Sequence, residues 1–274
     1  RAAQVGEAVS YVVNRNINYT NVCLYSCKFC AFSKRAGYSR GREPYDLDGT
    51  ELRRRVQEAR SLGATEVCLQ GGIHPGYTGE TYLDIVGTVK DAAPDVAIHA
   101  FSPLEIEHGA STLGLSIGEY LTCLKEAGLS SLPGTAAEIL DDSVRAIICP
   151  DKISSSRWLE IMASAHSLGL PTTATIMFGH IEGVDSWAQH WLQIIELQKV
   201  TSGFTECVPL PFVAHGSPIY RSGGARPGPT WREARLMHAV LRLMAGKQIP
   251  NIQASWVKLG HGGAVAMLSC GAND

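Results

Sequence analysis

The chain has 274 residues, of which 45% are apolar and 18% are charged, and its formal net charge is −2. This length suits one α/β barrel, and the apolar share supports a large core and excludes an intrinsically disordered chain. The near-neutral charge argues against a nucleic-acid partner held by bulk charge. The sequence has no run of 18 apolar residues, so no membrane-spanning helix is predicted.

Eight short runs rich in Val, Ile, Thr and aromatic residues, each bounded by turn residues, predict β-strands. In chain order these runs are Asn16–Val22, Glu66–Gln70, Val96–Phe101, Leu129–Leu132, Thr172–Phe178, Phe204–Pro209, Ile252–Val257 and Ala264–Ser269.

Helical patterns fill the gaps between these runs. Asp48 followed three residues later by Glu51 predicts a capped helix start, because this spacing lets the two residues satisfy free backbone N–H groups. The same spacing recurs at Ser116–Glu119 and at Thr230–Glu233. Apolar stripes at helical spacing cover residues 158–168 and 187–198.

Strict alternation of strands and helices predicts a parallel sheet, and eight strands predict a closed (β/α)₈ barrel of the TIM type. No linker-like segment divides the chain, so residues 1–274 are expected to form a single barrel domain. The chain starts at Arg1 inside an amphipathic stretch and stops at SCGAND, and we expect a catalytic unit trimmed at both ends.

Polar, glycine-rich stretches lie at or near the predicted strand ends. In chain order they read CLYSCKFC, QGGIHP, HAFSPLE, PGTAAE, FGHIE, PLPF, QASW and GAND. The C-terminal strand ends of a barrel form its catalytic face, so this convergence predicts an enzyme.

Cys23, Cys27 and Cys30 crowd into the loop after the first predicted strand. A disulfide knot would leave one thiol odd, and structural zinc usually takes four ligands as two close pairs, with no second pair nearby. A 4Fe-4S cluster takes cysteine thiolates, and one loop can supply three of them. The other five cysteines are scattered, and we expect them to be small core residues.

The pattern C-x₃-C-x₂-C with an aromatic residue before the last cysteine, after a first barrel strand, resembles the radical S-adenosylmethionine (SAM) superfamily. This resemblance implies a 4Fe-4S cluster on Cys23, Cys27 and Cys30, with SAM bound to the open iron. The reduced cluster of that superfamily cleaves SAM to a 5′-deoxyadenosyl radical.

The blocks NINYTNVC, EVCLQGGIHP, HAFSPLEI, PGTAAEIL, GHIE, PLPF, NIQASWVKLG and GAND resemble the tyrosine-using enzymes of FO synthesis. FO is the deazaflavin chromophore of coenzyme F(420). The resemblance implies a transferase that cleaves L-tyrosine and joins its 4-hydroxybenzyl group to 5-amino-6-(D-ribitylamino)uracil. It also implies a flavodoxin- or ferredoxin-like electron donor and a second radical SAM enzyme, separate or fused.

Two other functions stay open at this point. Radical SAM enzymes of the futalosine route to menaquinone share this block order, but their fourth-strand motif tends to read PGGGAE, whereas this chain has GTAAE at residues 134–138. A non-catalytic Fe–S or zinc protein is the more distant alternative, and it predicts no SAM cleavage.

The resemblance also implies site residues, each with a structural alternative such as a helix cap, a tight turn or a core histidine. For SAM binding we predict Phe29, Gly71, Gly72, Ser102, Glu105 and Glu138. For substrate binding we predict Gln70, His99, Thr135, His180, Gln253 and Trp256. Thr135 has the alternative of capping the helix after the fourth strand. No general base is assigned, and the cytoplasm is the default location.

Overall fold

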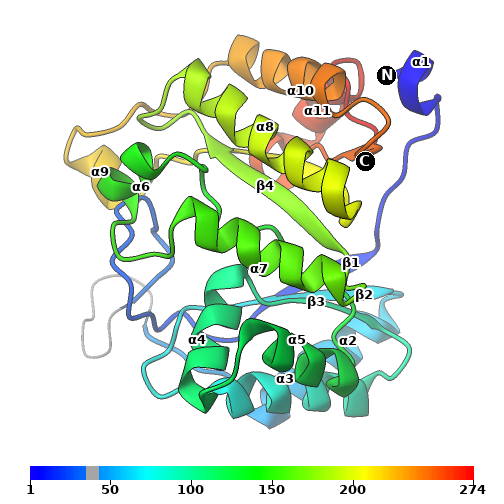
Figure 1. Cartoon of the computed structure of the whole chain (residues 1–274), viewed down its shortest axis with the longest axis vertical. Helices are drawn as coiled ribbons and strands as arrows, with labels where there is room; N and C mark the ends of the chain where they lie inside the picture. Colours follow the sequence, from blue (N-terminus) through cyan, green and yellow to red (C-terminus); the bar gives the residue numbers. More distant parts are fainter. Residues whose placement is uncertain (35–42) are drawn as a thin grey trace.

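The computed structural model describes residues 1–34 and 43–274, and Figure 1 shows their arrangement. Parallel strands form two three-stranded sheets with the orders β1-β2-β3 and β4-β5-β6. The strands are β1 (Asn14–Asn18), β2 (Glu66–Gln70), β3 (Ala97–Ala100), β4 (Thr172–Phe178), β5 (Phe204–Pro211) and β6 (Asn251–Ile252).

Helices cover the outer faces of both sheets (Figure 1). The helices of the described residues are α1 (Ala2–Val5), α2 (Gly49–Ser61), α3 (Gly79–Ala92), α4 (Pro103–Leu113), α5 (Ile117–Ala127), α6 (Asp142–Ile148), α7 (Ser155–Ser167), α8 (Val184–Thr201), α9 (Pro218–Arg221), α10 (Trp231–Ala245) and α11 (Trp256–Leu268), and α1 buries no residue. In the part of the chain that the structure describes, no helix is long and apolar enough to cross a membrane.

A short extended segment joins the two sheets. Ser131 forms a parallel bridge with His99 of β3, and Leu132 forms one with Thr172 of β4. This segment therefore occupies the fourth strand position of the barrel, although it is too short to be a regular strand.

The two chain ends meet beside β6. The amide of Asn273 donates to the carbonyl of Ile252 at 3.0 Å, and the amide of Ser10 donates to the carbonyl of Asn273 at 2.9 Å. The last residues thus lie between β6 and the segment that leads into β1. Among the described residues, β6 and β1 do not pair directly.

The strand pattern has an apolar outer face and a polar inner face. On β2, Val67 and Leu69 are fully buried in the core shared with α2, α3 and α5, whereas the alternate side chains of Cys68 and Gln70 stay partly exposed. Successive residues of a strand point to opposite faces, so the inner face of β2 carries its polar groups.

The TIM-type α/β fold is confirmed in its main elements. Both Glu66–Gln70 and Thr172–Phe178 are strands with the predicted bounds, and Asp48, Ser116 and Thr230 cap the predicted helices.

The predicted eighth strand is wrong, and the seventh is only partly correct. Residues 264–268 belong to α11, and the seventh strand ends at Ile252. The apolar run AVAML consists mostly of good helix formers, and periodicity alone does not separate a buried strand from a buried helix segment.

Candidate functional site

A cavity of about 200 Å³ lies where the loop after β1 meets the C-terminal ends of β2, β3 and the fourth strand position. Its lining residues are Cys23, Tyr25, Cys27, Phe29, Cys30, Phe32, Ser33, Gln70, Gly71, Gly72, Ile73, Ser102, Leu104, Glu105, Thr135, Ala136, Glu138 and Lys152. The cavity therefore lies on the face where a barrel of this type carries its chemistry.

Backbone hydrogen bonds hold the cysteine loop against the neighbouring strand-end loops. The amide of Leu24 donates to the carbonyl of Ile73, and the amide of Lys28 donates to the carbonyl of Ile148, both at 2.8 Å. The carbonyl of Lys28 accepts from the amide of Ile219 at 2.8 Å. The part of the loop at residues 23–30 is thus fixed although it contains no helix or strand.

The three thiols of this loop fit an iron–sulfur cluster. Cys23, Cys27 and Cys30 are free, partly exposed and line the cavity. The sulfur of Cys23 accepts from the amide of Ile73 at 3.3 Å, and the sulfur of Cys30 accepts from the amide of Ser33 at 3.4 Å. Such N–H donors stabilise cluster sulfurs and tune the reduction potential.

The same thiols do not converge on one ion. Within residues 1–34 and 43–274, no group of three or more His, Cys, Asp or Glu side chains could hold a single metal ion. A 4Fe-4S cluster distributes its cysteines over separate irons, so it does not require that convergence. Burial raises the pKa of Cys27 to about 12, while the charge of Lys152 opposes this shift.

Gly71 and Gly72 form the end of β2 beside the cysteine loop. A Cβ atom on Gly72 would lie 2.1 Å from the carbonyl oxygen of Val22 and 2.9 Å from the Cβ of Cys23. Only glycine permits this close approach of the two backbones, so the residue sets the distance between the end of β2 and Cys23.

Ser102 and Glu105 start α4 as a capping box at the cavity wall. The serine amide and hydroxyl each donate to Oε2 of Glu105 at 2.6 Å. The amide of Gly71 donates to Oε1 at 3.2 Å, and the hydroxyl of Tyr19 also donates to Oε1. Burial raises the pKa of Glu105, and these hydrogen bonds oppose that rise.

Glu138 and Lys152 form an ion pair in the cavity wall. Their Oε1 and Nζ atoms are 2.7 Å apart, and the side chains are only 14% and 10% exposed. The ammonium group also lies 5.4 Å from the ring centroid of Phe29, within cation–π range. The pair thus connects the fourth strand end to the cysteine loop.

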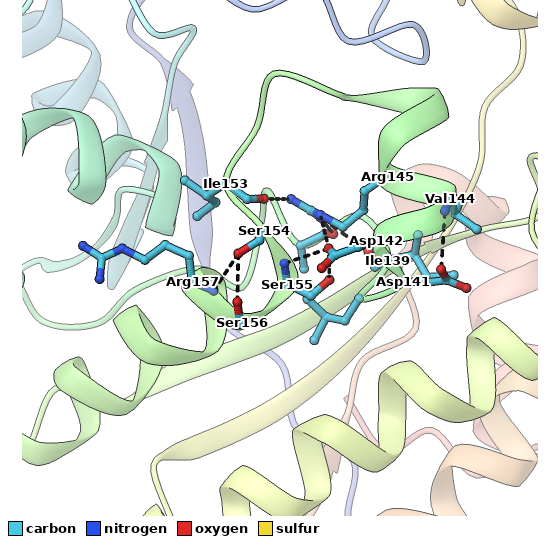
Figure 2. A network of polar contacts seen from close by, with 12 residues as sticks. Ile139, Asp141, Asp142, Val144, Arg145, Ile153, Ser154, Ser155, Ser156 and Arg157 are labelled. Atoms are coloured by element: carbon cyan, nitrogen blue, oxygen red, sulfur yellow. Dashed lines mark hydrogen bonds and ion pairs between the residues drawn. The ribbon is translucent and has the colours of Figure 1, made fainter.

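A buried guanidinium fixes the segment that carries Glu138 and Lys152. Figure 2 shows Arg145 of α6 aimed at the backbone of Ile153, the residue after Lys152, and of Ile139, the residue after Glu138. It donates to the carbonyls of Ala137 and Ile153, and at 3.4 Å to the carbonyls of Ala136 and Ile139. Arg145 therefore holds both ends of the segment in place.

Three residues with positive φ angles lie at the same strand ends. Phe101, Ala136 and Glu138 have φ values of 66°, 63° and 51°, in the left-handed region that side chains rarely adopt. Residues in such conformations cluster at functional sites, where the surrounding structure enforces them. Two of the three line the cavity.

The cavity brings together only part of the predicted site. The three cysteines, all six residues predicted for SAM and two predicted for substrate, Gln70 and Thr135, line it. Thr135 does not cap a helix, because Asp141 is the cap of α6.

The other four residues predicted for substrate lie outside this cavity. His99 contacts the hydroxyl of Ser131 at 2.6 Å, and burial lowers its pKa to about 4. Gln253 reaches Glu206 at 3.4 Å, and Trp256 is 59% exposed. The substrate role of these side chains stays a prediction.

His180 is fully buried in a network of its own. Its Nδ1 lies 2.9 Å from Oε2 of Glu182, and its Nε2 contacts the carbonyl of Met177 at 3.1 Å. The indole of Trp187 donates to Oε1 of Glu182 at 2.7 Å. Burial alone would raise the pKa of Glu182, but the contact with His180 and the donated hydrogen bonds lower it to about 2.

Glu182→Gln is expected to lower the free energy of unfolding at pH 7 by about 3 kcal/mol, since it removes a buried carboxylate that accepts hydrogen bonds from the amides of Gly179 and His180 and from the indole of Trp187. The pKa of Glu182 is lower in the folded protein than in the unfolded chain, where it is about 4.3. The extra unfolding free energy of the wild type is therefore complete above about pH 4.3 and disappears as the pH falls toward 2. Unfolding measured at pH 7 and pH 3 checks this. The exposed Glu119→Gln is the control, and a pH-independent difference would contradict the account.

Sequence reasoning missed Lys152 and Arg145. Lys152 lies in a turn between two helices, where a lysine is ordinarily solvated, and Arg145 follows a helix start without any motif. Their roles depend on the path of residues 133–155 through the fold, and no sequence spacing reports that path.

Residues 17–190 match the profile of the Radical SAM superfamily. An FO synthase of Streptomyces avermitilis is 48% identical over 100% of this chain and 32% of that protein. A Methanopyrus kandleri protein named 5-amino-6-(D-ribitylamino)uracil--L-tyrosine 4-hydroxyphenyl transferase is 50% identical over 98% of this chain and 72% of that protein. The chain spans about a third of the length of the FO synthases that it matches.

Two solved structures share the fold. Methylornithine synthase (PylB) superposes with a TM-score of 0.75 at 20% identity, over 99% of this chain and 72% of that one. HydG, a maturase of the [FeFe]-hydrogenase, superposes with a TM-score of 0.72 at 14% identity, over 99% of this chain and 57% of the HydG chain.

Membership of this superfamily implies a 4Fe-4S cluster and SAM as cofactors, and the three-thiol loop beside the cavity fits both. The extent of the profile match and the identity to the Methanopyrus transferase lead to one conclusion: the chain belongs to the radical SAM superfamily and, within it, to the family of that transferase.

Proposed function

We propose that this chain catalyses the tyrosine-dependent step of FO synthesis, joining the 4-hydroxybenzyl group of L-tyrosine to 5-amino-6-(D-ribitylamino)uracil. The observation that carries the proposal is the 50% identity to the Methanopyrus transferase over 72% of that protein's length. The three-thiol loop and the cavity beside it support the same proposal.

The cofactor pair supplies a 5′-deoxyadenosyl radical, and the residues of the chain position the reactants and exclude water. Cys23, Cys27 and Cys30 would hold the cluster in the fixed loop. The close approach of Gly72 to Val22 would keep the end of β2 against that loop. A small cavity walled by side chains protects a reactive intermediate from side reactions.

The polar inner face of the barrel suits the proposed uracil. An aminouracil with a ribityl chain presents many hydrogen-bond donors and acceptors, and the amide of Gln70 offers both kinds at the cavity wall. Thr135 adds a hydroxyl at the fourth strand end. Both residues therefore remain the proposed substrate contacts closest to the cysteine loop.

The proposal also includes partners. A low-potential electron donor of the flavodoxin or ferredoxin type would reduce the cluster, and a second radical SAM unit, separate or fused, would close the deazaflavin ring. We place these steps in the cytoplasm.

An anaerobic assay tests the proposed substrates. The reconstituted protein receives reductant, SAM, L-tyrosine and the diaminouracil, and mass spectrometry follows the products. The expected result is a hydroxybenzyl–uracil adduct that disappears when either substrate is omitted. An active preparation that forms no adduct but converts a futalosine-type nucleoside would overturn the assignment.

A further inference from the structure

Glu105 is buried where the first three strand ends meet. Its side chain belongs to α4, but its hydrogen-bond partners come from three other places in the fold: Tyr19 after β1, Gly71 at the end of β2, and Ser102 after β3. Only 2% of the residue surface is exposed.

Protein donors fill the hydrogen-bonding capacity of this carboxylate. Two oxygens offer about four acceptor sites. Ser102 occupies Oε2 with its amide and its hydroxyl, and Tyr19 and Gly71 occupy Oε1. The side chain of Glu138, by comparison, pairs with the ammonium group of Lys152. Glu105 therefore has no free acceptor for a cofactor.

The backbone that Glu105 binds at Gly71 also binds a predicted cluster cysteine two residues later. The next amide along, that of Gly72, donates to the carbonyl of Thr20 at 3.0 Å. The amide after that, of Ile73, donates to the sulfur of Cys23 at 3.3 Å. A shift of Gly71 thus moves a donor to the cysteine sulfur.

We propose that Glu105 is a positioning residue, which holds the Gly71–Ile73 backbone in register with the cysteine loop for SAM binding and does not itself contact SAM. The inference rests on the cofactor use of the superfamily and is independent of tyrosine and the uracil as substrates.

Glu105→Gln separates positioning from helix capping. Glutamine also serves at the third position of a capping box. Ser102 N lies at 2.6 Å and Gly71 N at 3.2 Å, so the amide oxygen is expected to keep the closer donor. The NH₂ group then faces the amide of Gly71, donor against donor, and the contact with Gly71 is lost.

The control is Glu119→Gln. Glu119 forms the same capping box with Ser116 at the start of α5, but it is exposed and lies outside the cavity. Any effect of capping alone should be equal in the two variants.

Two measurements test the proposal. Hydrogen exchange of the peptide covering residues 69–75, in the cofactor-free protein, should speed up in Glu105→Gln and not in the control. In the reconstituted protein, the dissociation constant for SAM should rise about tenfold in Glu105→Gln alone. Because less SAM is then bound at a given concentration, the change that SAM produces in the EPR spectrum of the reduced cluster should be smaller in Glu105→Gln than in the wild type.

The proposal would be overturned if Glu105→Gln had the hydrogen-exchange rate and the SAM affinity of the wild type. It would also be overturned if Glu119→Gln changed both quantities as much as Glu105→Gln does. Glu105→Leu, which lacks both acceptors, should weaken SAM binding further. A folded Glu105→Leu protein that binds SAM like the wild type would overturn it as well. Hydrogen exchange needs neither substrate nor cofactor, so its outcome is independent of the proposed reaction.

Discussion

Cys27→Ser is expected to abolish cluster assembly and SAM cleavage. Cys27 is the central thiol of the loop, and cluster irons require thiolate ligands that a serine hydroxyl does not replace. Iron and sulfide content after anaerobic reconstitution should fall well below the wild-type values. 5′-Deoxyadenosine formation should fall to background.

Cys123→Ser is the matched control for this variant. Cys123 is also a free, partly exposed thiol, but it lies on α5 and does not line the cavity. Its replacement should leave iron content and 5′-deoxyadenosine formation unchanged. A Cys27→Ser protein that keeps a full cluster would place the cluster on other cysteines.

Gly72→Ala is expected to lower SAM-dependent activity by about 100-fold. The added Cβ would lie 2.1 Å from the carbonyl oxygen of Val22, a distance that real Cβ atoms do not show, and that neighbour is backbone. The end of β2 and the cysteine loop must therefore separate, and a misplacement of about 1 Å costs about 100-fold in rate. The rate of 5′-deoxyadenosine formation measures the loss.

Gly87→Ala controls for the added methyl group. Gly87 lies within α3, and a Cβ there would meet nothing within 4 Å. The change should raise stability by about 0.8 kcal/mol, the propensity difference between alanine and glycine in a helix, and leave activity unchanged. Equal activities of Gly72→Ala and the wild type would show that the close approach is not needed.

Local signals in the sequence were sufficient for most of the fold. Asp48, Ser116 and Thr230 each cap a helix as predicted, because a cap depends on residues only three positions apart. The run Thr172–Phe178 is a strand with the predicted bounds, because its β-branched residues lie between turn signals.

Sequence signals failed where two structures suit the same residues. The run at 264–268 is apolar and short, and it is part of α11 because most of its residues are good helix formers. The barrel also uses residues 131–132 at its fourth strand position through two isolated bridges, and the last two residues of the chain bond to the backbone of Ile252 and Ala254 without forming a strand. Such short pairings leave no periodicity to detect.

The site was predictable in the residues that a motif marks. The three cysteines, Gly71 and Gly72 were predicted from spacing and resemblance, and they line one cavity, while their cofactor roles stay predictions. Lys152 was not found, because its ion-pair partner Glu138 lies 14 positions earlier in the chain, with α6 between them. The positioning role of Glu105 depends on three strand ends meeting, which only the folded chain reveals.

The most direct test of the central claim is 5′-deoxyadenosine formation by the anaerobically reconstituted, reduced protein. With SAM, L-tyrosine and 5-amino-6-(D-ribitylamino)uracil present, we predict 5′-deoxyadenosine in the wild type and in Cys123→Ser, and none in Cys27→Ser. A wild-type protein that carries a full cluster, binds SAM and yet forms no 5′-deoxyadenosine would contradict the account.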